Sequence, residues 1–149
     1  MKEDFLKYQA QTSPYPLGME VSHAVGSYIY DTNNKKYLDF VAGVSATSLG
    51  HQHPKVNKAI KNQLDKYSHV MVYGEYAQHP AVQYCKLLVE NLPPSLNKVY
   101  LVNSGTEACE GALKLVRRVT GRSQLISCHN AYHGNTMGSM SVIDRKSVV

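Results

Sequence analysis

The chain has 149 residues, of which 43% are hydrophobic and 18% charged, the size and composition of one globular domain able to bury a sizeable core. Its formal net charge of +5 comes from Lys and Arg residues spread along the sequence in runs no longer than a pair. Because a nucleic-acid interface needs clustered positive charge, we expect no nucleic-acid partner.

The cysteines and the opening residues bear on location. Three cysteines without a C-x-x-C spacing indicate a reducing compartment and no metal centre. The charged stretch Met1–Asp4 is followed by no apolar run that would form a secretory signal or cross a membrane. We therefore expect a cytoplasmic protein without a membrane partner.

The first part of the sequence predicts an irregular arm followed by a β-hairpin. Residues 1–25 contain prolines and a glycine that favour irregular structure. The aromatic-rich runs Ser27–Asp31 and Lys35–Phe40 flank the turn-forming residues Thr32–Asn34, the pattern of a hairpin. We expect this hairpin to belong to a small antiparallel lobe.

Two helices are predicted in the middle of the chain. Val41–Leu49 is a segment of small residues centred on Gly43. Pro54 suits the first position of a helix that continues to about Tyr67. A second helix is expected to start near Pro80 and to end before the pair Pro93-Pro94.

Two strand–turn units follow. The apolar run Val99–Val102 predicts a buried strand, and a helix begins near Glu107 and ends at Gly121. Gln124–Cys128 predicts the next strand, with His129–Gly134 as its exit loop. The alternation of helix and strand indicates an α/β fold with a mainly parallel sheet and flanking helices. The predicted helix carries an apolar stripe at helical spacing, formed by Ala108, Ala112, Leu115 and Val119.

The turn between the first strand and its helix is a candidate phosphate site. Ser104, Gly105 and Thr106 place hydroxyls and free backbone N–H groups at a helix N-terminus, where anions bind. The alternative is an ordinary βα turn, because glycine and hydroxyl residues fill such turns for capping reasons alone. The nucleotide motifs G-x-x-x-x-G-K-[ST] and G-x-G-x-x-G are both absent.

The loop after the second strand is a candidate partner of this turn. Loops that leave the C-terminal ends of parallel strands line the ligand crevice, so we expect Ser104–Thr106 and Tyr132–Gly134 to lie close together. An aromatic ring beside a phosphate cradle suits a flat phosphorylated ring, although Tyr132 and His133 alone fit ordinary loop residues. For Glu107 and Glu110 a capping role is favoured over a catalytic one.

Several motifs along the chain form one recognisable series. The strongest is N-S-G-T-E-A-x-E-x-A-x-K-L at residues 103–115, followed by N-A-Y-H-G at residues 130–134. Nearer the N-terminus the series includes G-S-Y-I-Y-D at 26–31, Y-L-D-F at 37–40, A-G-V at 42–44 and L-G-H-x-H-P at 49–54. Over roughly residues 14–143 this series resembles the class III pyridoxal-phosphate aminotransferases of fold type I, such as the ornithine, acetylornithine and 4-aminobutyrate aminotransferases.

This resemblance implies a cofactor, a reaction and a set of site residues. Ser104, Gly105 and Thr106 would hold the phosphate of pyridoxal 5'-phosphate, Tyr132 would stack on its ring and His133 would lie beside it. The reaction would transfer an amino group from an amine or amino acid to a 2-oxo acid.

The resemblance also implies an organisation. The intact enzyme would be a homodimer in which Gly43 and Val44 lie near the substrate entrance. Residues 1–54 would form the N-terminal arm and small-lobe hairpin. Residues 55–149 would begin the large cofactor-binding domain, which this chain carries only in truncated form.

The sequence departs from the family in two ways. Asn135 stands where relatives that act on acetylornithine or 4-aminobutyrate commonly have Arg, so a bidentate grip on a substrate carboxylate is not expected there. No lysine matches the family's cofactor-binding position, so we expect no catalytic residue in this chain and no turnover by the chain alone. The alternative function is a non-catalytic phosphate-ligand-binding module or a structural remnant of an aminotransferase.

Overall fold

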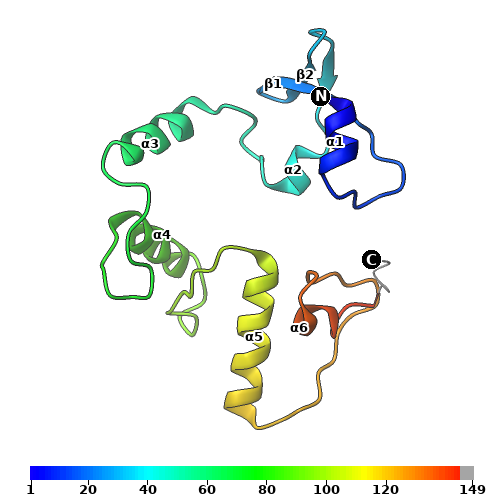
Figure 1. Ribbon diagram of the computed structural model, residues 1–149. Helices are drawn as coiled ribbons and strands as arrows, with labels where there is room; N and C mark the ends of the chain where they lie inside the picture. The colour runs from blue at the N-terminus through cyan, green and yellow to red at the C-terminus, as the bar shows by residue number, and fades with distance from the viewer. Residues whose placement is uncertain (145–149) are drawn as a thin grey trace. The chain divides into compact units, whose positions relative to one another are not determined.

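The computed structural model describes residues 1–144 and divides the chain into two compact units, Met1–Tyr76 and Ala77–Val149 (Figure 1). The first unit contains a three-stranded antiparallel sheet and short helices. The second contains the long helix α5 and the loops at its N-terminus.

The sheet of the first unit has the order β1-β2-β3, with β1 at Val21–Val25, β2 at Tyr28–Asp31 and β3 at Lys36–Leu38. The predicted hairpin is confirmed as β2 and β3. The irregular arm predicted for residues 1–25 is wrong, because helix α1 occupies Lys2–Tyr8 and β1 pairs with β2. The prolines and the glycine all precede β1, so the backbone groups of β1 remain able to form hydrogen bonds with β2.

Asp31 shapes the hairpin turn through hydrogen bonds with nearby residues. Its Oδ1 accepts from the backbone N–H groups of Asn33 (2.8 Å) and Lys35 (2.9 Å). Its Oδ2 accepts from the Tyr37 hydroxyl at 2.9 Å. Asn34 adopts a left-handed conformation with φ 60°, which asparagine tolerates well. The turn predicted at Thr32–Asn34 is therefore confirmed.

The small-residue segment after the hairpin forms an unusual left-handed turn. Helix α2, Ala42–Ser45, consists of four residues with φ between 47° and 67°. This conformation is costly for the β-branched Val44. Asp39 supports the turn, since its Oδ1 accepts from the N–H groups of Val41 (3.1 Å) and Ala42 (2.9 Å).

The predicted helices all form, with boundaries close to those expected. They are α3 at Pro54–Leu64, α4 at His79–Glu90 and α5 at Gly105–Thr120. Prolines occupy the first turns of α3 and α4, where their missing N–H groups have no acceptor to lose. Gly121 ends α5 in the left-handed conformation (φ 67°, ψ 5°), as the sequence indicates. A short helix, α6, spans Met137–Met140.

The two segments predicted as parallel strands carry no strand structure. Val99–Val102 and Gln124–Cys128 are irregular, and Ile126 is fully exposed. A strand is defined by backbone hydrogen bonds to a neighbour, and the described part of the chain contains no neighbouring strand for either segment. The two strand predictions are therefore wrong for the described residues, because neither segment has a neighbouring strand with which to form backbone hydrogen bonds.

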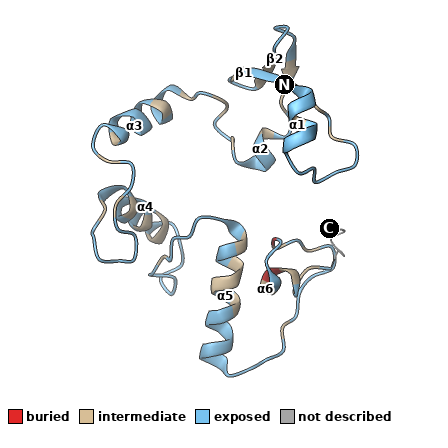
Figure 2. Cartoon of the chain, in the orientation of Figure 1, coloured by how far each residue is buried: buried red, intermediate tan, exposed pale blue. Residues whose placement is uncertain are grey.

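The expectation of a sizeable core is also wrong for the residues described. Among residues 1–144 no hydrophobic side chain is buried, and the buried colour of Figure 2 is confined to the region of α6, where Ser139 is completely inaccessible. In the part of the chain that the structure describes, close packing between elements is limited to β1 with β2, β2 with β3, and α5 with α6. The apolar faces of the other helices therefore have no covering element in the described residues. None of the helices described has the length and apolar character that crossing a membrane requires.

Candidate functional site

The N-terminus of α5 presents unpaired backbone donors. Ser104 is the N-cap residue, and its hydroxyl accepts from Glu107 N at 3.3 Å. The Glu107 carboxylate in turn accepts from Asn103 N at 2.7 Å. The first intrahelical bond runs from Ala108 N to Ser104 O at 3.0 Å. The N–H groups of Gly105 and Thr106 consequently have no acceptor within the helix and are available to an anion.

The loop at residues 132–135 lies against this helix end, as the sequence predicts. Together they line a shallow cleft of about 470 Å³ that is widely open to solvent. The Tyr132 side chain is 64% exposed and available to a ligand, whereas His133 is half-buried. The cleft is lined by Gly105, Thr106, Cys109, Tyr132, His133, Gly134 and Asn135.

Gly134 permits the close approach of the loop to the helix. A Cβ atom at this position would lie 2.2 Å from Thr106 Oγ1 and 2.4 Å from Thr106 Cβ. Its φ of 119° also belongs to a region that L-residues rarely adopt. Only glycine therefore fits, and the loop contacts Thr106 directly.

The Thr106 hydroxyl is used inside the protein. It lies 2.9 Å from Thr136 Oγ1 and donates to Ser139 Oγ at 2.9 Å. Ser139 in turn donates to the Thr136 carbonyl at 3.1 Å. Because its one hydroxyl proton goes to Ser139, Thr106 has its backbone N–H left to offer to a ligand.

Glu110 joins α5 to the residues that follow the loop. Its Oε1 accepts from Gly138 N (2.9 Å), from Ser139 N (3.1 Å) and from the Thr136 hydroxyl. These hydrogen bonds, that of Thr136 above all, hold the pKa of the Glu110 carboxyl below its usual value, although partial burial opposes them. The sequence favours a capping role for Glu110 and gives no sign of this tertiary one, because no motif indicates a contact across so many residues.

The remaining predicted residues belong to the first unit. Gly43 and Val44 lie in the left-handed turn, where Val44 is 86% exposed. Near this turn, His51 Nε2 lies 2.7 Å from Asp39 Oδ2, a contact between two loops that no motif in the sequence indicates. The hydrogen bond from Ala42 N, followed by that from His51, lowers the pKa of the Asp39 carboxyl.

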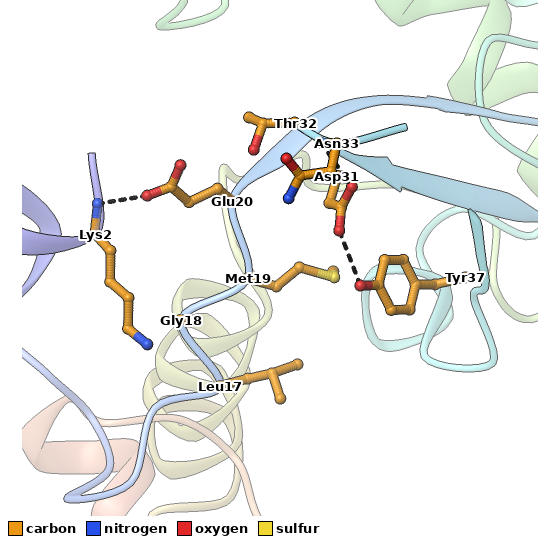
Figure 3. Close-up of a pocket in the computed structure, with 9 residues that line it drawn as sticks. All are labelled: Lys2, Leu17, Gly18, Met19, Glu20, Asp31, Thr32, Asn33 and Tyr37. Atoms are coloured by element: carbon orange, nitrogen blue, oxygen red, sulfur yellow. Dashed lines mark hydrogen bonds between the residues drawn. The ribbon is translucent and has the colours of Figure 1, made fainter. Parts of the chain in front are cut away.

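A second cavity, of about 390 Å³, lies in the first unit between α1, the segment before β1 and the hairpin turn (Figure 3). Two hydrogen bonds cross its walls, from Tyr37 to Asp31 (2.9 Å) and from the Lys2 backbone N–H to Glu20 (2.7 Å). None of the predicted site residues lines it. Within residues 1–144, no group of three or more His, Cys, Asp or Glu residues is arranged to hold a metal ion.

Comparison with known proteins identifies the relatives of this chain. The family model for class-III aminotransferases matches residues 8–149. The acetylornithine aminotransferase of Methanopyrus kandleri is 40% identical over 116 residues, which are 78% of this chain and 29% of the relative. That of Bacillus anthracis is 39% identical over 123 residues, 83% of this chain and 31% of the relative. The chain thus spans about a third of the length of these relatives.

Solved structures agree on the fold. A taurine:2-oxoglutarate aminotransferase from Bifidobacterium kashiwanohense, solved in complex with PLP and glutamate, matches 97% of this chain and 32% of its own with a TM-score of 0.87 and 30% identity. An adenosylmethionine-8-amino-7-oxononanoate aminotransferase from Methanocaldococcus jannaschii matches 96% of this chain and 35% of its own with a TM-score of 0.86 and 30% identity. The predicted fold class, the N-terminal part of an α/β PLP-transferase, is confirmed.

Proposed function

The chain belongs to the class-III aminotransferase family, and we propose that it supplies the part of such an enzyme that holds the phosphate and the ring of pyridoxal 5'-phosphate. The observation that carries this proposal is the cleft at the N-terminus of α5. It combines free backbone N–H groups, suited to a phosphate, with the side chain of Tyr132, suited to an aromatic ring.

The residues present fit the cofactor. The N–H groups of Gly105 and Thr106 would donate to the phosphate, with Ser104 at the helix cap. Tyr132 would stack on the pyridine ring, with His133 beside it. The volume of about 470 Å³ falls in the range of sites for small molecules. When bound, pyridoxal phosphate supplies an electron sink for the amino-transfer reaction.

The proposed reaction is transamination between an amine or amino acid and a 2-oxo acid in the intact enzyme. Asn135, at the edge of the cleft, would meet the substrate with a neutral amide instead of the charge of an arginine. The named relatives act on chemically different amino donors, so the proposal leaves the donor open.

Further proposals concern organisation. We place Gly43 and Val44 near the substrate entrance of a homodimer, in a cytoplasmic enzyme. Residues 1–54 would belong to its small lobe and residues 55–149 would begin its large domain.

Among residues 1–144, no lysine lines the cleft. Because the chemistry needs an activated amine at the cofactor, we expect the 149-residue chain to bind the cofactor without transaminating. This separates the proposal from its alternative, a structural remnant, which would not bind. Measurable turnover by the purified chain would contradict the requirement for the lysine.

The binding test uses pyridoxine 5'-phosphate, an alcohol that cannot condense with surface lysines. A Cβ at Gly105 meets no atom within 4 Å, so Gly105→Asp adds a carboxylate beside the cradle without a clash. We expect saturable binding to the wild-type chain and a loss of about tenfold or more for Gly105→Asp, because the carboxylate repels the phosphate. Gly105→Asn is the neutral control of nearly the same shape. Equal affinities of the Asp and Asn variants would contradict a phosphate at this position.

Cys109 offers a second, local measurement, since its thiol is in the wall of the cleft. In a chain with Cys85→Ser and Cys128→Ser, alkylation of Cys109 reports on the cleft alone. We expect pyridoxine 5'-phosphate to slow alkylation in proportion to its occupancy. An alkylation rate that saturating ligand leaves unchanged would place the ligand elsewhere.

A further inference from the structure

One carboxylate oxygen carries most of the polar contact between α5 and α6. Glu110 Oε1 accepts three hydrogen bonds from residues 136–139, two from backbone N–H groups and one from a hydroxyl. A Cβ on Gly138 would lie 2.2 Å from Glu110 Oε2, so the backbone rests directly on the carboxylate. Hydrogen bonds to a charged acceptor are about twice as strong as neutral ones.

The residues held by Glu110 continue directly from the wall of the cleft. Tyr132–Asn135 line the cleft and Thr136 follows them without a break. Because the chain is continuous, the position of residues 136–139 on α5, together with the contact of Gly134 with Thr106, constrains where the ring of Tyr132 lies relative to the donors of Gly105 and Thr106.

A different carboxylate closes the same loop on itself. Asp144 Oδ2 accepts from Asn130 N at 2.8 Å, and Asp144 N donates to Ala131 O at 3.3 Å. These bonds tie the two ends of the segment 130–144 together without involving α5. Loss of the Glu110 carboxylate would therefore leave a closed loop that is less firmly held to the helix.

We propose that Glu110 is a positioning residue of the cofactor site: its carboxylate fixes the loop carrying Tyr132 and His133 at the distance from the α5 N-terminus that one phosphorylated ring requires. This inference rests on the proposed function. Glu110 acts through the loop and touches no ligand itself.

The test compares two ligands. Inorganic phosphate would contact only the phosphate cradle, the backbone donors of Gly105 and Thr106. Pyridoxine 5'-phosphate would contact this cradle and also the aromatic wall, the side chain of Tyr132. Glu110→Ala removes the acceptor, and Glu110→Gln keeps an oxygen for the same three donors without the charge. The control is Glu90→Gln, at the exposed end of α4, where the carboxylate makes only a surface ion pair with Lys86 at 3.7 Å. Hydrogen exchange at the amides of Gly138 and Ser139 is the readout that needs no ligand.

We expect Glu110→Ala to accelerate exchange at both amides about tenfold or more, since it removes their charged acceptor. The same variant should bind pyridoxine 5'-phosphate about tenfold more weakly than the wild-type chain, and its affinity for inorganic phosphate should stay within about twofold of the wild-type value. Glu110→Gln should fall between wild type and Glu110→Ala, and Glu90→Gln should match wild type in all three measurements.

Four results would overturn the inference. They are wild-type amides that exchange as in an unstructured chain, exchange unaffected in Glu110→Ala, faster exchange with unchanged affinity for pyridoxine 5'-phosphate, and equal weakening of both ligands. The last would mean general destabilisation. If the wild-type chain protects the amides and binds neither ligand, the proposed cofactor site fails as well, and that result is distinguishable from the others.

Discussion

The hairpin β2–β3 and the segment Val99–Val102 have similar β-favouring sequences and different structures. The hairpin strands pair with each other across a short turn. Val99–Val102 forms no strand, because the described residues contain no neighbour for it. The difference shows that a strand with a local partner forms from its own segment of chain, whereas a strand of a parallel sheet depends on residues far away in the sequence.

The carboxylates of the two regions repeat this contrast. Asp31 accepts from residues two to six positions away, within its own turn. Glu110 accepts from residues 26 to 29 positions away, so that its hydrogen bonds join α5 to the start of α6. Local contacts therefore hold the turn of the β2–β3 hairpin, whereas the cleft at the α5 N-terminus is held by a few contacts between residues far apart in the sequence.

The first prediction concerns the apolar helix faces that no other element covers in the described residues, and we expect its effect to exceed those of the predictions that follow. On α5 the stripe residues Leu115 and Val119 are 61% and 74% exposed. Apolar surfaces of this extent bind other apolar surfaces, so we expect the purified chain to bind an apolar dye strongly and to self-associate. Dye fluorescence and sedimentation check this. A monodisperse monomer that binds no dye and unfolds cooperatively would contradict the view that these apolar faces lack a covering element.

The second effect concerns the contact that forms the cleft. Gly134→Ala places a Cβ 2.2 Å from Thr106 Oγ1, so the loop must move away from the helix. We expect pyridoxine 5'-phosphate to bind about tenfold to a hundredfold more weakly, the range that overpacking costs. Gly74→Ala is the matched control, because Gly74 also has a positive φ (82°) but meets no atom within 4 Å. Equal affinities of the two variants would contradict the account, because the contact between Gly134 and Thr106 would then not matter for binding.

The sequence predicted what local rules determine. Pro54, Ser104 and Gly121 mark helix ends through their own chemistry, and the residues around Asp31 mark the turn. The meeting of residues 104–106 with residues 132–134 followed from one rule about strand ends.

Of the features that escaped prediction, three have clear physical reasons. The carboxylate contacts of Glu110 join residues that no periodicity connects, and the Asp39–His51 contact joins two loops. The strand β1 was missed because its partner decides its structure more than its composition does.

The third effect concerns the aromatic wall. We expect the Tyr132→Ala variant to bind pyridoxine 5'-phosphate about fivefold to tenfold more weakly, because it loses one aromatic stacking contact. Tyr132→Phe keeps the ring and should bind as the wild type does. Inorganic phosphate, measured in parallel by equilibrium dialysis, should be unaffected by either change. A Tyr132→Phe variant as weak as Tyr132→Ala would show that the hydroxyl matters and the ring does not.

The smallest effect concerns pH. The hydrogen bond from Lys35 N is the main cause that lowers the pKa of Asp31 below 3.8, and the Thr136 hydroxyl is the main cause for Glu110, below 4.5. A carboxyl whose pKa is lowered by folding stabilises the fold above its unfolded pKa, and that stability is lost as the pH falls through the folded value.

We therefore expect the amides of Asn33 and Gly138 to stay protected at about pH 5 and to lose protection only when the pH falls below the ordinary carboxyl pKa, as each lowered pKa is passed. Asp31→Asn should remove the pH dependence at Asn33 and leave that at Gly138 unchanged. Carboxyl titrations by NMR with midpoints at or above the ordinary values would contradict both assignments.

The central claim, that the α5 N-terminus holds a phosphate and not merely a ring, is tested most directly by comparing pyridoxine 5'-phosphate with pyridoxine. The two ligands differ only in the phosphate, and neither condenses with lysine. Because the phosphate would accept charge-assisted hydrogen bonds from Gly105 and Thr106, we expect the phosphorylated ligand to bind the wild-type chain about a hundredfold more tightly. Equal affinities, or no saturable binding of either ligand, would contradict the account.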